Sequence, residues 1–282
     1  MISAQPFDQS TVRSALALAG AAPSIRNSQP WRWSVEQGTV HLYSVSSPLA
    51  AETQTRDLLM SCGAALHHLR VALAASGLAS TVHRLPDVAE PDHLAALEMR
   101  PCSAAATDLA HTAAILRRRS DRRRFTNRDV PHVLVTDLIA RAAAHGASLR
   151  PVTAAGTRAR LVDAIRATPG NRVHQPAAGE PDGTLLMLLA TGSDDLIARL
   201  RAGEALSAVL LRATALGLAT CALSRPLDVG SSRQDFEEEV FGGAEAPQLA
   251  LRVGWAPTGR PVPPTPRRSI DDMVTWPAGR RF

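Results

Sequence analysis

The sequence predicts an α+β fold built from two diverged halves, in which central antiparallel or mixed sheets are flanked by helices. Two observations favour this architecture. Residues 61–78 and 201–218 are both rich in alanine and leucine, are apolar over most of a helical circumference and end in Gly-Leu, which is typical of a central helix closed by glycine. Each segment precedes an apolar run that is typical of a short strand, at 94–99 and at 249–253.

The similarity of the two segments indicates an internal duplication, although helices rich in alanine and leucine also resemble one another by chance. The small residues before position 107 suit a join between the halves. We therefore expect an N-terminal half at 1–106 and a C-terminal half at 107–282, interlocked as one structural unit. With 282 residues, 45% of them hydrophobic, the chain can bury a large core.

The remaining elements follow from the spacing of apolar residues. This spacing predicts helices at about 9–20, 107–120, 132–145 and 156–167. Strands are predicted at 31–35 and 40–45, joined as a hairpin through Gln37 and Gly38, and at 185–190.

The charge of the chain is carried by one kind of cation. All 31 basic residues are arginine, which excludes Schiff-base chemistry and a P-loop lysine. Arginine clusters bind phosphate well because a planar guanidinium can hold two oxygens. The net charge of +5 would also suit nucleic acid, but with 4% aromatic residues there are few surfaces on which bases could stack.

No metal site, disulfide framework or membrane anchor is expected. The three cysteines, Cys62, Cys102 and Cys221, are far apart and form no C-x-x-C pair. No apolar run approaches the length that spans a bilayer, and the N-terminus has no secretory pattern. We therefore expect a cytoplasmic protein that does not bind a membrane.

A first polar motif lies at 22–33, between a predicted helix and a predicted strand. It carries Pro23, Ser24 and Asn27 among further hydroxyl and amide side chains. Amides offer both donors and acceptors, as the polar edge of a flavin ring requires. The alternative is a polar loop that caps the helix and is anchored by the tryptophans that follow.

Two further motifs are rich in arginine. Residues 116–125 read LRRRSDRRRF, and in an extended segment Arg118, Ser120 and Arg122 would share one side. From the residues alone, a phosphate site and a generic basic patch are equally good interpretations. Arg267 and Arg268 follow a proline-rich stretch that would direct them, although a surface tail is the alternative.

Together, A-P-S-x-x-N-x-Q-P-W-R, R-R-S-x-R, G-x-A-L with a Gly-Leu helix end, and P-R-R near the C-terminus resemble the nitroreductase family. The likeness covers most of the chain and is greatest to the Acg-type subfamily, in which two nitroreductase-like halves are fused. In the ordinary family, FMN lies at a homodimer interface. The arginine segments come from one subunit and the Pro-Ser loop from the other.

The two halves of this chain have lost complementary parts. The first half has the Pro-Ser loop but no R-R-S-x-R, which residues 7–13 replace. The second half has both arginine segments, but only residues 142–151 stand where the Pro-Ser loop would be. The resemblance therefore implies a nitroreductase-like fold, with two halves that mimic the homodimer and parts for one FMN site.

Residue by residue, the resemblance implies three groups of cofactor-binding residues. The R-R-S-x-R segment would face the phosphate, ribitol and pyrimidine edge, and the C-terminal arginines would hold the phosphate. The loop would lie against the isoalloxazine, and the stretch 222–225 would approach flavin N5. The expected set is Pro23, Ser24, Asn27, Arg118, Arg119, Ser120, Arg122, Leu223, Ser224, Arg267 and Arg268.

The resemblance implies an FMN-dependent oxidoreductase with no catalytic side chain of its own. Hydride would pass from NAD(P)H to FMN N5 and then, in a ping-pong cycle, to a flat acceptor such as a nitroaromatic or a quinone. The alternatives are a flavin-sequestering protein with little turnover and, less favoured, a binder of nucleic acid or another anionic partner. We expect a monomer that acts as a pseudo-dimer, or a homodimer. The connection at 166–182 is short, so the substrate pocket is either more open or completed by a partner chain.

Overall fold

The computed structural model describes residues 8–36, 38–45, 52–169, 173 and 183–276. The chain divides into two compact units. The first unit comprises residues 1–116 together with 265–282, and the second comprises residues 117–264. The C-terminal segment therefore belongs to the first unit, although the sequence assigns it to the second half.

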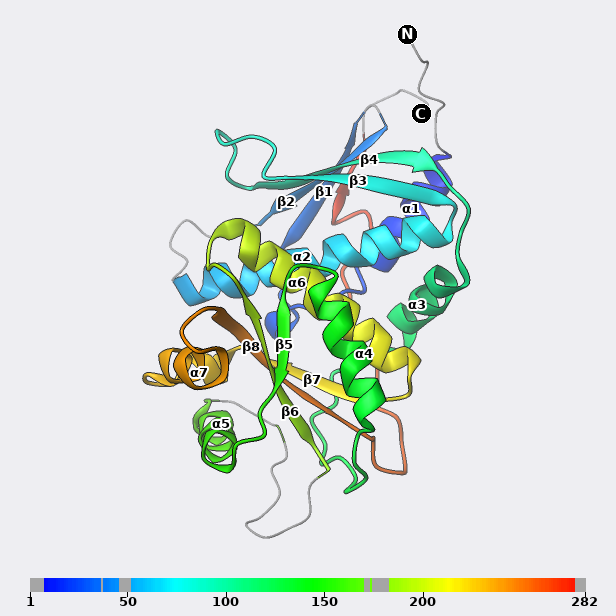
Figure 1. The fold of residues 1–282 in the computed structure, drawn as a ribbon. Coiled ribbons are helices and arrows are strands. Elements are labelled where there is room, and N and C mark those ends of the chain that lie inside the picture. The colour runs from blue at the N-terminus through cyan, green and yellow to red at the C-terminus, as the bar shows by residue number, and fades with distance from the viewer. Residues whose placement is uncertain (1–7, 37, 46–51, 170–172, 174–182, 277–282) are drawn as a thin grey trace. The chain divides into compact units, whose positions relative to one another are not determined.

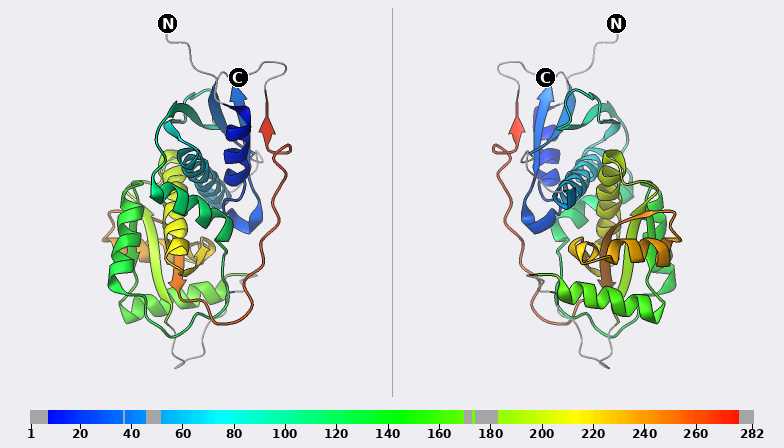
Figure 2. Two further views of the ribbon diagram at one scale, coloured as in Figure 1. Left: turned by 90° about the vertical axis from the view of Figure 1, so that its right-hand side faces the viewer. Right: turned by 90° about the vertical axis from the view of Figure 1, so that its left-hand side faces the viewer.

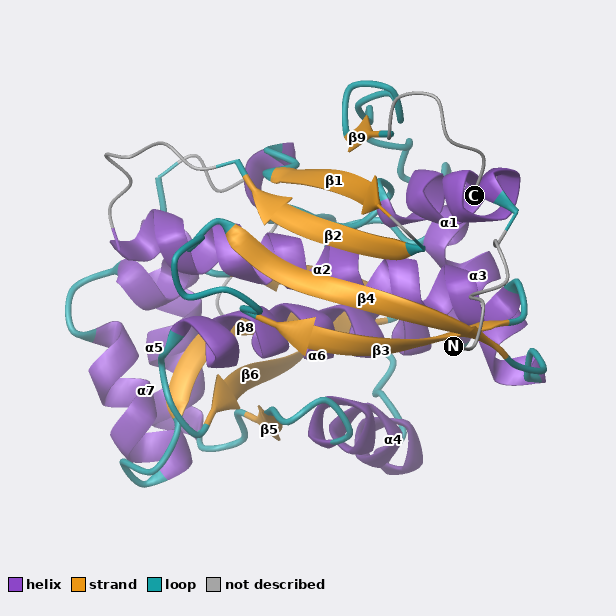
Figure 3. Ribbon diagram, turned by 90° about the horizontal axis from the view of Figure 1, so that it is seen from above, coloured by secondary structure: helices purple, strands orange, loops and turns teal. Residues whose placement is uncertain are grey.

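The first unit is a five-stranded sheet with helices (Figure 1). Its strands follow the order β3-β4-β2-β1-β9, and all neighbours are antiparallel except β1 and β9. Figure 3 shows this order, with the long helix α2 beneath the sheet. The elements are α1 (Gln9–Ala19), the 3-10 turn η1 (Ile25–Asn27), β1 (Trp31–Glu36), β2 (Thr39–Ser44), α2 (Glu52–Ala75), β3 (Leu78–Arg84), β4 (His93–Pro101), α3 (Ala106–Arg117) and β9 (Val274–Thr275).

Strand β1 shows why this sheet has one buried face. Successive side chains of a strand point to opposite sides. Trp31, Trp33 and Val35 are almost fully buried, whereas Arg32 and Glu36 are exposed. The tryptophans therefore fix the register of β1, because a slip by one residue would expose both rings.

The C-terminal segment adds the last strand to this sheet. β9 pairs in parallel with β1, with Val274 opposite Trp33. The Trp33 N–H donates to the Met273 carbonyl at 2.7 Å, and the Trp31 indole N–H lies 3.3 Å from the Met273 sulfur. Figure 2 shows the red segment that ends in β9 reaching the edge of the sheet.

The second unit is a four-stranded antiparallel sheet in the order β5-β6-β8-β7. Helix α6 packs on β6 and β7, and α5, η2 and α7 pack around a core that includes Leu161, Leu188 and Phe236. The elements are α4 (His132–Ala143), β5 (Ser148–Pro151), α5 (Ala155–Ala167), β6 (Leu185–Thr191), α6 (Leu196–Ala215), β7 (Ala219–Leu223), the 3-10 turn η2 (Arg225–Asp228), α7 (Ser232–Phe241) and β8 (Ala246–Gly254).

The two sheets share one strand order, since β3-β4-β2-β1 corresponds to β7-β8-β6-β5. In each unit a long apolar helix, α2 or α6, leads into the edge strand. Each helix is followed by a glycine with positive φ, 78° at Gly77 and 80° at Gly217, where other residues would be strained. This correspondence agrees with a duplication of the halves, which stays a prediction.

Most predicted elements are confirmed, and two expectations need correction. The helix predicted at 107–120 ends at Arg117, because the chain beyond it pairs with β7 instead of continuing the helix. The stretch 142–151, taken as the counterpart of the Pro-Ser loop, is the end of α4, a short turn and β5. The hairpin residue Gln37 and most of the connection 166–182 lie outside the described residues.

One stretch of α2 differs from the expectation that no apolar run is long enough to span a membrane. By length and composition alone, Thr55–Ala75 could cross one. However, 78% of its most apolar window is buried within the structure. A helix that is apolar around its circumference is buried either in lipid or in a protein core, and here the protein core covers it.

Candidate functional site

The Pro-Ser loop of the first unit has an unusual backbone. Three residues that are not glycine have positive φ: Arg26 at 54°, Asn27 at 60° and Gln29 at 47°. Such conformations cost about 1–3 kcal/mol each and persist where surrounding contacts impose them. Inside the loop, the Ser24 hydroxyl accepts from the Gln29 N–H at 3.0 Å. The loop therefore needs further contacts to hold its shape.

The C-terminal arginine segment supplies some of these contacts. The Asn27 amide donates to the Pro266 carbonyl at 3.0 Å, and the Arg267 guanidinium donates to Asn27 Oδ1 at 2.7 Å. Arg267 also donates to the Ala21 carbonyl at 3.2 Å. The sequence separation between Asn27 and Arg267 is 240 residues. Two of the predicted motifs thus meet within the first unit.

Gln29 fixes the second arginine of this segment. Its side chain is 5% exposed, and Oε1 accepts from the Arg268 backbone N–H at 2.9 Å. The Arg268 guanidinium donates to the Gln29 carbonyl at 3.3 Å and to the Asp272 carbonyl. Arg268 is itself exposed, so its guanidinium can also reach a ligand.

In the second unit, the segment after α3 lies along the edge strand β7. Ser120 forms a parallel bridge with Thr220, and the Asp121 N–H donates to the Thr220 carbonyl at 2.8 Å. Arg118 is 6% exposed, and its guanidinium lies 3.4 Å from the Ser120 hydroxyl. Arg119 instead turns back to donate to the Arg118 carbonyl at 2.8 Å.

Asp121 and Arg123 form an ion pair beside this segment. Arg123 Nη2 lies 2.6 Å from Asp121 Oδ2, and Arg123 Nε lies 3.0 Å from Oδ1, which is a two-pronged geometry. Burial alone would raise the pKa of the Asp121 carboxyl. Hydrogen bonds from Arg123 outweigh that effect, and the pKa lies below its ordinary value. Asp121 therefore stays ionised, and its charge is matched by Arg123.

A buried arginine supports the same segment from beneath. Arg252 on β8 is 1% exposed, and its guanidinium lies 4.6 Å from the centre of the Phe125 ring. It also lies 3.4 Å from the Arg123 carbonyl. Gly254 leaves room for the ring, because a β-carbon there would lie 2.6 Å from Phe125 Cδ2.

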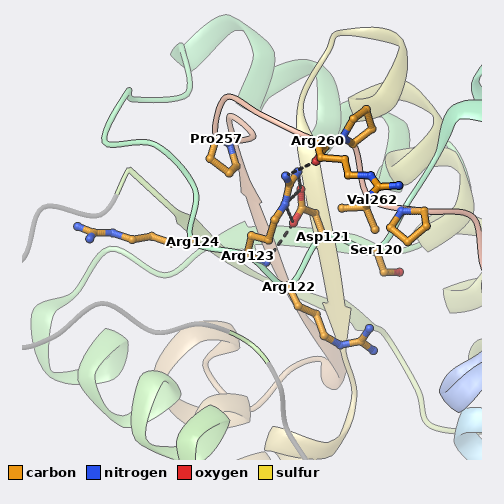
Figure 4. A pocket seen from close by; sticks show the side chains of 10 residues that line it. Ser120, Asp121, Arg122, Arg123, Arg124, Pro257, Arg260 and Val262 are labelled. Atoms are coloured by element: carbon orange, nitrogen blue, oxygen red, sulfur yellow. Dashed lines mark hydrogen bonds and ion pairs between the residues drawn. The ribbon is translucent and has the colours of Figure 1, made fainter.

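A pocket of about 780 Å³ opens beside the segment (Figure 4). Ser120 and Arg122 lie in its wall, together with residues that the motifs do not include. In Figure 4 the Ser120 hydroxyl lies between the guanidinium groups of Arg122 and Arg260, while Arg124 points to the other side. The lining residues are Ser120, Asp121, Arg122, Arg123, Arg124, Pro257, Arg260, Pro261, Val262 and Pro263.

Ser224 presents a buried polar atom that needs a partner. It follows β7 directly and is 3% exposed. Among the described residues, its hydroxyl has no hydrogen-bond partner. An unsatisfied buried hydroxyl is costly, so such a group in a folded protein calls for an explanation. A ligand that bonds to the hydroxyl would supply one.

The predicted site residues therefore form two groups. In the first unit, Asn27, Arg267 and Arg268 belong to one hydrogen-bonded network with the loop that contains the half-buried Pro23 and Ser24. In the second unit, Arg118 contacts Ser120, and only Ser120 and Arg122 of the predicted set line the pocket. Leu223 ends β7 and Ser224 follows it, just before η2, and neither residue lines the pocket.

Sequence reasoning missed three supporting residues. Arg252 sits within an apolar run, where nothing in the sequence marks a buried charge. Gln29 stood in the first motif, but its bond to Arg268 depends on chain ends far apart in sequence. Arg260 lies in the proline-rich stretch. Prolines stiffen the backbone, and this stiffness was the one feature of the sequence that indicated a fixed position for Arg260.

Comparison with known proteins gives clear relatives, although no protein-family model matches the chain. The chain is 39% identical to "Putative NAD(P)H nitroreductase Rv3131" of Mycobacterium tuberculosis, over 96% of this chain and 92% of the relative. It is 33% identical to "Putative NAD(P)H nitroreductase acg" of the same organism, over 93% of this chain and 94% of the relative. Among solved structures, a nitroreductase with bound FMN from Desulfitobacterium hafniense DCB-2 matches with a TM-score of 0.45 and 16% identity, covering 59% of this chain and 97% of that one.

Proposed function

Since the chain belongs to the nitroreductase family, in its Acg-type branch, we propose that it is an FMN-dependent oxidoreductase that transfers reducing equivalents from NAD(P)H to a flat acceptor. A nitroaromatic or a quinone has the required shape and chemistry. When bound, FMN supplies the ring nitrogen that accepts and returns hydride. The protein supplies binding, orientation and charge.

The observation that carries this proposal is the arginine-lined pocket at the R-R-S-x-R segment. Four arginines line it, and Asp121, the one carboxylate among its lining residues, is paired with Arg123. Such a surplus of guanidinium groups favours a ligand that carries phosphate. The volume of about 780 Å³ lies in the range of cofactor pockets.

The residues of the second unit fit the polar parts of FMN. Ser120 is bridged to Thr220 of the edge strand β7, and the Arg118 guanidinium contacts the Ser120 hydroxyl, so we propose that both side chains donate to phosphate and ribitol oxygens. Arg122 is exposed, and its positive charge at the pyrimidine edge would stabilise the negative charge of the reduced flavin. The buried Ser224 hydroxyl has no hydrogen-bond partner among the described residues, so we propose that it bonds to the flavin ring. The backbone of Leu223 would approach the ring beside it.

The residues of the first unit fit the remaining roles. We propose that Arg267 and Arg268 hold the phosphate and that Pro23 and Ser24 lie against the isoalloxazine. Asn27 holds the loop through its bonds to Pro266 and Arg267. Arg119, whose guanidinium bonds to the chain itself, would act by shaping the segment.

The test is an anaerobic titration of the purified, FMN-loaded protein with NADH and with NADPH. The proposal predicts that the yellow flavin absorbance is lost and that it returns when a quinone or a nitroaromatic is added. Yellow colour that persists through both titrations would refute turnover and leave a flavin-sequestering protein. A colourless protein that gains no flavin on incubation with FMN would refute cofactor binding itself.

A pair of matched variants localises the cofactor. Arg122→Gln removes an exposed guanidinium from the pocket and is expected to weaken FMN binding about tenfold, the loss of one charge-assisted contact. Arg166→Gln removes an exposed guanidinium from α5, outside the pocket, and serves as the control. Equal FMN affinity in both variants would contradict the role of Arg122.

A further inference from the structure

The arginine-lined pocket extends beyond the residues that the proposed FMN site uses. Its far wall is the stretch 257–263, with Pro257, Pro261, Val262 and Pro263 as apolar surface. Arg260 belongs to this wall, and no motif assigns it a role. The pocket therefore has a further cationic group and an apolar surface beside the residues of the proposed FMN site.

The Arg260 side chain is held out by an anchored backbone. Its carbonyl accepts from Arg123 Nη1 at 2.9 Å, which ties the proline-rich stretch to the residue that follows the R-R-S-x-R segment. The Arg260 guanidinium itself makes no hydrogen bond or ion pair within the part of the chain that the structure describes. It is exposed, and Figure 4 shows it extending along the same wall as Val262.

The charge of the pocket favours a phosphate monoester. Asp121 is the one carboxylate among the lining residues, and Arg123 already engages both of its oxygens. In Rossmann-type sites, a carboxylate accepts the ribose 2′-hydroxyl of NADH, whereas an arginine accommodates the 2′-phosphate of NADPH. The same preference of phosphate for arginine over carboxylate follows from charge in any fold. In this pocket the Arg260 guanidinium is available to a phosphate, whereas the Asp121 carboxylate is already bound by Arg123.

From this arrangement we propose that the pocket binds the adenosine 2′-phosphate of NADPH, with Arg260 as the residue that selects NADPH over NADH. The adenosine would pack on the proline wall while the phosphate meets the guanidinium fork. This inference rests on the proposed function, since it names the electron donor of the same reaction. Arg260 is a specificity residue and takes no part in hydride transfer.

The FMN phosphate is a second source of the same chemistry. It too is a phosphate monoester, and Ser120 and Arg122 lie in the same pocket. The two sources differ in which affinity Arg260 controls. Loss of Arg260 would weaken NADPH binding in one case and FMN binding in the other.

The experiment compares the wild-type protein with Arg260→Gln, Arg260→Lys and the control Arg166→Gln. Calorimetry measures the Kd of 2′,5′-ADP and of 5′-AMP, which differ by the 2′-phosphate, in FMN-loaded and in flavin-free protein. Wild type is expected to bind 2′,5′-ADP at least about tenfold more tightly than 5′-AMP. Arg260→Gln should remove that difference, Arg260→Lys should keep part of it, and Arg166→Gln should leave it unchanged.

Steady-state kinetics gives a second measure. Arg260→Gln is expected to lower the ratio of kcat/KM for NADPH to that for NADH about tenfold. The proposal is overturned if wild type does not discriminate between the two nucleotides, or if Arg260→Gln weakens FMN binding while the discrimination survives. Failure of the proposed function looks different, because a protein that cannot be reduced would still show the 2′,5′-ADP preference by calorimetry.

Discussion

Replacing Asn27 by alanine tests whether the C-terminal segment holds the Pro-Ser loop in its unusual conformation. The substitution removes the bond from the Asn27 amide to the Pro266 carbonyl, at 3.0 Å, and the acceptor for Arg267, at 2.7 Å. It also places alanine at a φ of 60°, where asparagine is tolerated better.

The expected loss follows from these three effects. A neutral hydrogen bond contributes about 1 kcal/mol, and a bond to a charged group contributes about 1.5–3 kcal/mol. The left-handed conformation costs alanine about 1 kcal/mol more. Because the site is partly exposed, water replaces much of both bonds, and we expect a total destabilisation of about 2 kcal/mol.

Urea unfolding of three proteins provides the assay. Asn27→Ala should lower the free energy of unfolding by about 2 kcal/mol. Asn27→Asp keeps an acceptor for Arg267 and tolerates the positive φ, so it should lose less than about 1 kcal/mol. If Asn27→Ala stays within about 0.5 kcal/mol of wild type, or if both variants lose the same stability, the contacts of Asn27 do not hold the loop.

Three further perturbations are expected to have measurable effects. Gly254→Ala would force Phe125 from its place, since the new β-carbon lies 2.6 Å from Cδ2, and should cost about 1–3 kcal/mol in chemical unfolding; an unchanged midpoint would contradict the packing. Met273→Ala removes a side chain that is 2% exposed and contacts Trp31. It should lower the free energy of unfolding by about 2–4 kcal/mol and increase proteolysis after Arg268. Resistance to proteolysis equal to that of wild type would show that β9 does not depend on Met273. Burial alone would raise the pKa of the Asp194 carboxyl, but hydrogen bonds from Arg199, Gln248 and Arg233 outweigh burial and lower the pKa. The stability that ionised Asp194 contributes is therefore fully present above the ordinary aspartate pKa of 3.8 and is lost as the pH falls below it. Asp194→Asn should therefore be less stable than wild type at pH 7 by a margin that shrinks towards about pH 2; a margin that is constant with pH would exclude this linkage.

Helices and buried strands could be predicted because their signal is local. The apolar spacing of 156–167 and the run at 185–190 correspond closely to α5 and β6. The end of the helix predicted at 107–120 could not be predicted in this way. Arg118 to Ser120 leave the helix because β7, about 100 residues later, offers backbone partners, and single-sequence patterns do not record such pairing.

The candidate site shows the same division. The motifs predict Asn27, Arg267 and Ser120 as site residues, because their residue types suit phosphate and amide chemistry. The supporting contacts depend on tertiary structure, such as the buried Arg252 that lies against Phe125. The left-handed conformation of Gln29 could not be predicted either, since it exists because Arg268 and Ser24 hold both ends of that residue.

We propose that each chain binds one FMN and that the arginine-lined pocket of the second unit takes part in binding it. The most direct measurement is the amount of FMN bound per chain at saturation, by equilibrium dialysis, for wild type, Arg122→Gln and the control Arg166→Gln. One FMN per chain, with weaker binding in Arg122→Gln and unchanged binding in Arg166→Gln, is the predicted result. A stoichiometry of zero or two, or an affinity that Arg122→Gln leaves unchanged, would contradict this proposal.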